Sequence, residues 1–343
     1  MNIIYGVSGE GFGHATHAIA IASYLEKKGH KVVIITYGKA YDVLKDKFKT
    51  FLVNGLYMDC KNGKINPLKT LFSNSNHFIR NFSKIKKIKN LIKNFKPEIC
   101  ISDMEPFSAW ISIIYKLPLI SISNQNRFVH YKLNIPKKYK KDYFLLKTII
   151  KIINPKSDYK IALSLCKLEP KNLNSFIVAP IIKEEIKKIK PSIKDKIVVY
   201  LSKENPRFIE TLKQIKENFV IFPYEKERKE ANLFFRKKEN FLNELKDCKA
   251  IISNAGFTSV GEAIYLKKPY LAIPLKGQFE QVFNSIYIEK KGFGKFLENG
   301  EKQGILEFIK NINIYSKNLK KNKKQDYDIL FDILDNILKK HKG

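Results

Sequence analysis

Cysteine and long apolar runs are both scarce in this chain. Only four of its 343 residues are cysteines, and no two of them form a C-x-x-C pair. This spacing excludes a disulfide scaffold and a cysteine zinc site, and it predicts reduced thiols. No apolar run reaches the roughly 18–20 residues of a membrane span. The N-terminal residues also lack the basic region and the cleavage site of a secretory signal, so we expect a cytoplasmic protein.

Acidic residues are few as well. The chain has 33 Asp and Glu against 64 Lys and Arg, which gives a net charge of +31 at pH 7. Such a charge favours an anionic partner: a nucleic acid, an acidic lipid or a phosphorylated substrate. A general enrichment in lysine explains the charge equally well. Because the basic residues are dispersed and no motif for reading nucleic acid is visible, we expect no nucleic-acid partner.

Two basic segments predict amphipathic helices. In residues 78–95, apolar side chains recur at helical spacing among lysines, and in residues 136–155 a basic cluster precedes an apolar stretch. Either helix could pack on a sheet or lie on an anionic bilayer. Packing on a sheet is favoured for 78–95, whereas both interpretations stay open for 136–155.

Apolar strands alternate with helices along the chain, and the pattern restarts after residues 178–191. Continuous apolar strands separated by helices are typical of parallel sheets with helices on both faces. We predict an α/β protein of two facing Rossmann-like domains, 1–180 and 181–316, with a C-terminal helix in 317–343 that packs back toward the first. The expected strands are 2–8, 30–37, 97–103, 117–123, 196–202, 218–224, 250–256 and 269–275. The expected helices are 17–29, 106–116, 206–218, 239–248, 259–268, 281–292 and the last twenty or so residues.

A glycine-rich loop, residues 6–17, joins the first strand to the first helix. Its glycines allow positive φ and close approach of a ligand, and the following helix N-terminus favours an anion. The strand 30–37 does not end in the acidic residue of a dinucleotide fold, so a dehydrogenase is disfavoured. The candidate phosphate-binding residues of this loop are Gly9, Gly11, Gly13 and His17.

His14 is the candidate general base of this loop. The nearby helix N-terminus disfavours imidazolium, and a neutral imidazole can accept a proton. A histidine that only caps the helix is the alternative. Asp103, at the end of strand 97–103, could orient His14 or act as the base itself. Asp103-Met104-Glu105 mimics a D-x-D metal motif, but it ends at Pro106 in the N-terminal half, and we expect no bound metal.

A second strand–turn–helix, within residues 252–285, is more informative. The strand ends in Asn254, and Gly256, Thr258 and Ser259 open a helix whose free N–H groups suit a diphosphate. Glu262, one turn further on, could accept both hydroxyls of a ribose. The next strand is followed by G-Q-F-E-Q, at the end of a strand where α/β sheets bind ligands. The candidate sugar-binding residues there are Gln278, Glu280 and Gln281.

N-A-G-F-T-S-V-G-E-A, followed by G-Q-F-E-Q-x-x-N, resembles the donor-site signature of GT-B fold glycosyltransferases. The similarity is greatest to the group of the peptidoglycan N-acetylglucosaminyltransferase (family 28, family 1-like). G-E-G-F-G-H-A-T-H resembles the acceptor-side loop of that group, and S-D-M-E-P and S-N-Q-N resemble its N-terminal domain. His17 stands where many relatives have arginine.

The resemblance implies an inverting, metal-independent transfer of a sugar from a nucleotide sugar, such as UDP-GlcNAc, to a glycan or lipid-linked acceptor. The nucleotide sugar is a substrate, so no cofactor is implied. Gly256, Thr258 and Ser259 would hold the diphosphate, Glu262 the ribose, and Glu280 with Gln281 the donor sugar. A lipid-linked acceptor would bring residues 136–155 to an anionic membrane surface.

Three alternatives stay open at this point. A nucleotide-sugar 2-epimerase has the same architecture and needs no acceptor. A sugar-nucleotide sensor on this fold would bind the donor without turning it over. A basic nucleic-acid-binding protein would explain the net charge, although the basic residues are not gathered in one stripe.

Overall fold

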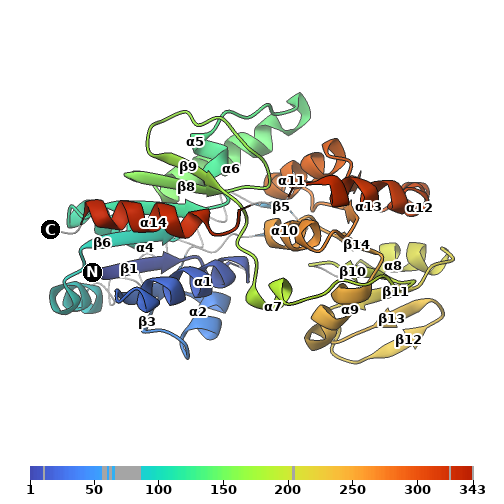
Figure 1. The fold of residues 1–343 in the computed structure, drawn as a ribbon, viewed down its shortest axis with the longest axis horizontal. Helices are drawn as coiled ribbons and strands as arrows, with labels where there is room; N and C mark the ends of the chain where they lie inside the picture. Colours follow the sequence, from blue (N-terminus) through green and yellow to red (C-terminus); the bar gives the residue numbers. More distant parts are fainter. Residues whose placement is uncertain are drawn as a thin grey trace. The chain divides into compact units, whose positions relative to one another are not determined.

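The computed structural model describes residues 1–10, 12–55, 86–202, 205–323 and 326–341, together with the backbone of 60–61 and 64–65. The chain forms two compact units, one of Met1–Ile181 with Asp326–Gly343 and one of Ile182–Gln325. Each unit is built on a seven-stranded sheet (Figure 1). The predicted α/β class with two largely parallel sheets is confirmed.

All neighbouring strands of the first sheet pair in parallel, in the order β3-β2-β1-β6-β7-β8-β9. Its central strands are buried along their whole length, which is why they consist almost only of apolar and small residues. The strands are β1 (Asn2–Val7), β2 (Lys31–Thr36), β3 (Thr50–Leu52), β6 (Ile99–Asp103), β7 (Leu119–Ser123), β8 (Tyr159–Leu163) and β9 (Ser175–Val178). A separate two-stranded ladder joins β4 (Cys60–Lys61) to β5 (Lys64–Ile65).

Helices cover this sheet. Alternate strand residues point to opposite faces, and Ile4 and Cys100 share one core with α4 and the helix of residues 86–95. Ile88 and Ile92 of that helix are buried there, which confirms sheet packing for this part of the segment 78–95; residues 78–85 lie outside the described residues. The other helices of the first unit are α1 (Gly13–Lys27), α2 (Gly38–Leu44), α4 (Pro106–Ile114), α5 (Asn126–His130) and α6 (Lys140–Ile153), with a 3-10 turn, η1 (Lys137–Tyr139).

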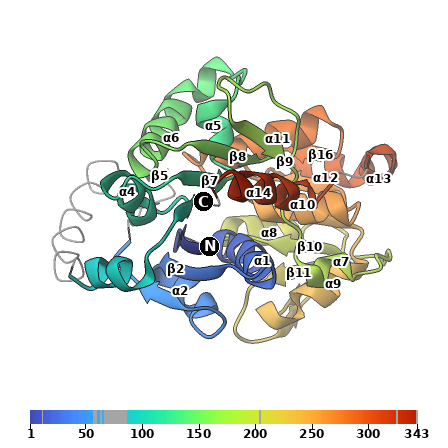
Figure 2. The ribbon, with the colours of Figure 1, turned by 60° about the vertical axis from the view of Figure 1, so that its left-hand side comes forward.

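The last helix, α14 (Ile329–Lys340), packs on α1 within the first unit (Figure 1, Figure 2). The ring of Tyr24 stacks on Phe331, with ring centres 4.3 Å apart. The Tyr24 hydroxyl and the Lys28 ammonium both donate to Asp335, at 2.9 and 3.0 Å. These contacts attach the end of the chain to the unit that contains its beginning.

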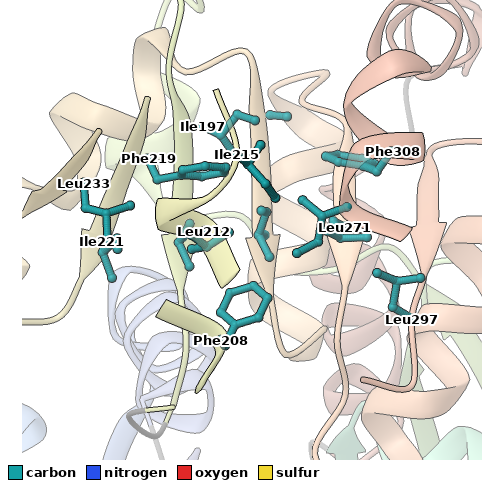
Figure 3. Close-up of a cluster of buried hydrophobic side chains, with 14 of the residues drawn as sticks. Ile197, Phe208, Leu212, Ile215, Phe219, Ile221, Leu233, Leu271, Leu297 and Phe308 are labelled. Atoms are coloured by element: carbon teal, nitrogen blue, oxygen red, sulfur yellow. The ribbon is translucent and has the colours of Figure 1, made fainter. Parts of the chain in front are cut away.

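The second sheet has the order β12-β13-β11-β10-β14-β15-β16 and is parallel except for the edge strand β12. Phe208 and Leu212 of α8 and Phe308 of α12 form a core on one of its faces (Figure 3). Its strands are β10 (Ile197–Tyr200), β11 (Phe219–Phe222), β12 (Arg228–Glu230), β13 (Leu233–Phe235), β14 (Ala250–Ser253), β15 (Tyr270–Ala272) and β16 (Gly294–Phe296). Its helices are α7 (Glu184–Lys187), α8 (Pro206–Lys213), η2 (Lys238–Asn240), α9 (Phe241–Asp247), α10 (Phe257–Tyr265), α11 (Phe279–Lys290), α12 (Lys302–Lys310) and α13 (Ile312–Lys321).

Three helices begin earlier than the sequence predicts. Helix α1 starts at Gly13 rather than residue 17, α10 starts at Phe257 rather than 259, and α11 starts at Phe279 rather than 281. The apolar periodicity that locates a helix begins only in its second turn, because the first turn makes no internal N–H bonds and tolerates glycine and polar residues. Among the described residues, no helix has the length and apolarity needed to cross a bilayer.

Candidate functional site

The first candidate site lies where β1 and β6 end side by side. The two strands pair in parallel with Val7 opposite Asp103, and the Ser8 N–H donates to the Asp103 carbonyl at 2.9 Å. The loop after β1 leads into α1, so the first turns of α1 lie beside the carboxyl end of β6. A helix and a residue almost ninety positions later in the chain are thereby brought to one edge of the sheet.

Two histidines of α1 share the Asp103 carboxylate. The Nδ1 atom of His14 lies 2.8 Å from Oδ1, and the Nδ1 atom of His17 lies 3.2 Å from Oδ2. The pairing follows from the early start of α1, because residues at i and i+3 lie on one helical face. Sequence reasoning paired Asp103 with His14 alone and missed His17, although the H-x-x-H spacing inside a helix was the available signal.

The shared carboxylate fixes which nitrogen of each ring donates. A carboxylate only accepts hydrogen bonds, so each Nδ1 carries a proton, and the lone pair of a neutral ring is then on Nε2. Burial raises the pKa of Asp103, but the charges and hydrogen bonds of His14 and His17 outweigh it and hold this pKa below its usual value. His14 is 12% exposed and His17 is 2% exposed. His14 can therefore meet a substrate, whereas His17 is placed to orient the carboxylate.

The glycines of this loop serve packing rather than unusual backbone angles. Neither Gly6, Gly9 nor Gly13 has a positive φ, so that expectation was wrong for them. A Cβ on Gly9 would lie 2.2 Å from the Tyr37 carbonyl oxygen, and one on Gly6 would lie 2.0 Å from Ser108 Oγ. Gly13 is the first residue of α1. Gly11 lies outside the described residues, so its predicted role stays a prediction.

Asp103 and Glu105 point in different directions. Met104 between them adopts the left-handed region, with φ 54°, a conformation that strains a non-glycine residue. Glu105 turns back to cap α4, accepting the N–H groups of Phe107 at 2.9 Å and Ser108 at 2.7 Å. Both carboxylate oxygens of Glu105 are therefore used at the N-terminus of α4. Asp103 and Glu105 do not form a metal-binding pair in this arrangement.

Glu105 predicts a pH dependence of stability. Burial raises the pKa of this carboxyl from 4.5 to about 7, against the hydrogen bonds of Ser108 and Phe107. The folded protein then holds a proton that the unfolded chain releases, so this contribution to stability is full below pH 4.5 and is lost as the pH rises through about 7. In Glu105→Gln this loss, at most about 3 kcal/mol, should be absent. Chemical denaturation of both proteins between pH 4.5 and 8 measures it, and parallel profiles would contradict the assignment.

His14, His17 and Asp103 are also the one group of possible metal ligands found among the described residues, with ligand atoms all within 4.8 Å of one another. Two imidazoles and a carboxylate are a set that transition metals accept. In this structure both Nδ1 atoms are directed at carboxylate oxygens, so the three side chains form one hydrogen-bonded group.

The second candidate site lies at the carboxyl ends of β10, β14 and β15. Asn254, just after β14, holds these three ends together: its Oδ1 accepts the Ser202 N–H at 2.8 Å and its Nδ2 donates to the Ile273 carbonyl at 2.9 Å. Both ends of this amide are therefore engaged by the backbone. Asn254 shapes the site, and direct contact with a ligand stays a prediction.

Side-chain hydrogen bonds fix the turn from β14 into α10. Ala255 has φ 56°, and its carbonyl accepts the side-chain amide of the fully buried Asn284 at 2.9 Å. Ser259 Oγ donates to the Gly256 carbonyl at 2.9 Å and lies 2.8 Å from the Tyr270 hydroxyl. The Ser259 hydroxyl is thus used inside the fold, which leaves the first-turn N–H groups and Thr258 for the anion that the sequence predicts. Sequence reasoning missed the roles of Asn284 and Tyr270.

Glu262 is buried one turn inside α10. Its side chain is 6% exposed, and the Lys183 ammonium lies 3.2 Å from its Oε1. None of the residues that the structure describes donates a hydrogen bond of good geometry to that oxygen, so the contact is an ion pair. Burial raises the pKa of Glu262, and the charge of Lys183 acts against this. Sequence reasoning selected Glu262 but not Lys183.

The remaining predicted residues surround the start of α11. Gln278 precedes the helix and Glu280 lies in its first turn. Gln281 Oε1 accepts the Leu275 N–H at 2.8 Å, which fixes this amide against the loop after β15. The structure therefore places Gln281 at the same edge of the second sheet as Gly256 and Asn254, because β14 and β15 pair in parallel.

The family of the chain follows from comparison with known proteins. The model of glycosyl transferase family 1 matches residues 1–313. The chain belongs to this family. Among its relatives are two proteins named as uncharacterized glycosyltransferases, one from Methanosarcina acetivorans, 24% identical over 91% of this chain and 90% of the relative, and one from Methanosarcina mazei, 25% identical over the same shares.

Solved structures of similar fold are glycosyltransferases too. The calicheamicin glycosyltransferase CalG4 superimposes with a TM-score of 0.65 at 14% identity, over 93% of this chain and 92% of CalG4. The spinosyn rhamnosyltransferase SpnG complexed with thymidine diphosphate gives 0.60 at 11% identity, over 94% and 95%. These similarities confirm the GT-B fold. Together with the family match, they show that this member of glycosyl transferase family 1 is a transferase.

Proposed function

We propose that this enzyme is an inverting, metal-independent glycosyltransferase that moves a sugar from a UDP-sugar, such as UDP-GlcNAc, to a hydroxyl of a glycan or lipid-linked acceptor. The observation that carries the proposal is the His14–Asp103 contact of 2.8 Å in a chain of this family. An activated hydroxyl is what sugar transfer needs on the acceptor side.

His14 acts as the general base in this proposal. Its Nδ1 proton is held by Asp103, so Nε2 takes the proton of the acceptor hydroxyl as the oxygen attacks the anomeric carbon. Asp103 then stabilises the imidazolium that forms. His17, on the second carboxylate oxygen, keeps the carboxylate in place.

The leaving diphosphate is stabilised at α10. The first-turn N–H groups of α10 have no partner within the helix and carry the positive end of its dipole, so in this proposal they offset the developing charge without a metal. Glu262 takes the ribose hydroxyls, and Glu280 and Gln281 take those of the donor sugar. SpnG has been crystallised with thymidine diphosphate, which supports a nucleoside diphosphate at this fold but not a particular base.

The test is release of UDP from UDP-GlcNAc in the presence of glycan and lipid-linked acceptors, with and without EDTA. A thermal-shift panel of UDP-, GDP- and dTDP-sugars first selects the donor, since a ligand at 100 times its Kd adds about 2.7 kcal/mol of stability. Activity lost in EDTA and restored by a metal would overturn metal independence. UDP-ManNAc formed without acceptor would instead identify a 2-epimerase.

We further propose that α6 and the turn before it bind the inner face of an anionic membrane. Tyr143 and Ile150 of α6 are buried, whereas Phe144 is 57% and Ile152 61% exposed, and these two lie on one outward stripe because they are eight residues apart. Exposed lysines surround the stripe. They are Lys137, Lys138, Lys140, Lys141 and Lys151. An apolar stripe among lysines is typical of helices at anionic bilayers.

The protein is therefore expected to sediment with anionic but not neutral vesicles at low salt, and to be released as salt screens the charges. Phe144→Ser with Ile152→Ser should abolish sedimentation. Leu173→Ser, at a side chain 91% exposed outside this segment, is the matched control. Equal binding to both vesicle types would rule out the electrostatic mechanism.

A further inference from the structure

Lys183 lies among the residues proposed to hold the donor, although the donor-site signature does not include it. It precedes α7 in the second unit, and its Nζ is 3.2 Å from Oε1 of Glu262 in α10. Burial raises the pKa of Tyr200, the last residue of β10, and the positive charge of Lys183 lowers it. The ammonium therefore lies near the carboxyl end of β10 and the first turns of α10.

The two partners of this ion pair differ in their access to water. The Lys183 side chain is 34% exposed and that of Glu262 is 6% exposed. Glu262 Oε1 accepts no well-directed hydrogen bond in the described structure. A buried carboxylate needs a partner that offsets its charge. A lysine with a flexible, partly exposed side chain can leave such an ion pair at a small cost in free energy, because water then solvates its ammonium. The pair is therefore suited to an exchange in which Glu262 gains new donors and Lys183 gains a new anion.

Two lysines that follow α10 in the second unit are occupied elsewhere. Lys268 is buried and donates to the carbonyls of Ser192 and Cys248, and Lys267 donates to the Asn322 carbonyl. Both lie beyond the C-terminal end of α10, away from its N-terminus. Lys276, in the loop between β15 and α11, is exposed.

We propose that Lys183 is a donor-binding residue that exchanges partners. In the free protein it pairs with Glu262. When the nucleotide sugar binds, the ribose hydroxyls donate to Glu262 and the Lys183 ammonium moves to the diphosphate, where it adds a positive charge to the N–H groups of α10. This inference rests on the donor site of the proposed function and names a residue within it.

The test compares UDP with uridine, because only UDP carries the diphosphate. Lys183→Ala should raise the Kd of UDP about tenfold, which is about 1.4 kcal/mol, and leave the Kd of uridine within about twofold. Lys183→Arg should keep the UDP Kd within about threefold of wild type. Lys276→Ala, which removes one charge at an exposed loop, and Lys187→Ala, whose partner is the surface residue Glu184, are the matched controls and should bind both ligands as the wild type does.

The outcomes separate this inference from the proposed function. Wild-type protein that binds neither UDP nor another nucleoside diphosphate would overturn the proposed function itself. Wild-type binding with unchanged UDP affinity in Lys183→Ala would overturn only the exchange. Equal weakening of UDP and uridine would show that Lys183 merely shapes the site, and it would overturn the exchange too. Should Lys183→Ala fail to fold, Lys183→Gln gives the same comparison with a longer side chain.

Discussion

His14→Ala should lower the rate of sugar transfer by about 10²–10⁴-fold while the protein stays folded. That range is typical for loss of a general base. The ring is only 12% exposed, but its Nδ1 contact is with Asp103 at the end of β6, and alanine is a good helix former in α1. Single-turnover measurement of UDP release with saturating donor gives the rate. Turnover within a few-fold of wild type would exclude His14 as the base.

Three comparisons show that a slow His14→Ala enzyme has lost chemistry and not binding. Its thermal shift with UDP should equal that of wild type, because the proposed donor residues belong to the second unit. Asp103→Asn should be comparably slow, and the double variant no slower than either, since the two residues act as one group. His17→Ala, which removes the 3.2 Å contact to the second carboxylate oxygen, should cost less. Additive losses would contradict a shared proton-transfer group.

Much of the fold could be predicted because each sheet is covered on both faces. Strands such as β1 and β6 are then buried along almost their whole length, consist mostly of apolar residues, and stand out from the helices between them. The motif residues could be located for a related reason, since parallel strands bring their carboxyl ends to one edge. The sequence alone therefore predicts Asp103 near the loop after β1 and Gln281 near the turn after β14.

What could not be predicted depends on neighbours distant in sequence. Nothing around Lys183 indicates that it meets a carboxylate about eighty residues later. Asn254 looks like a ligand-binding residue, yet its amide ties Ser202 to Ile273. His17 shares Asp103 only because α1 begins at Gly13. In each case the residue type was compatible with several partners, and tertiary structure selected one.

The two glycine loops look alike in sequence, but their glycines face different surroundings. A Cβ on Gly9 would lie 2.2 Å from the Tyr37 carbonyl oxygen and 2.4 Å from its ring. The Tyr37 ring cannot move away, because Gly55 packs against it. A Cβ on Gly55 would lie 2.1 Å from the ring. Gly256 has φ −60° and ψ 144°, and the nearest atom to an added Cβ is Ser259 Oγ at 3.7 Å. The first loop is filled by the protein, whereas the second is open.

Gly9→Ala should therefore act mainly on stability, and Gly256→Ala mainly on UDP binding. Gly9→Ala should lose at least about 2 kcal/mol of stability, because a backbone carbonyl and a trapped ring must move. Gly256→Ala should lose less than about 1 kcal/mol, the cost of alanine at a helix N-cap, but should raise the Kd of UDP about tenfold or more, because its methyl group would keep the diphosphate from the first-turn N–H groups of α10. Urea unfolding and UDP titration of both variants measure the two effects. A diphosphate that accepts hydrogen bonds from those amides must come close enough to contact the added methyl group. If Gly256→Ala binds UDP as wild type does, the diphosphate is therefore not bound at this turn.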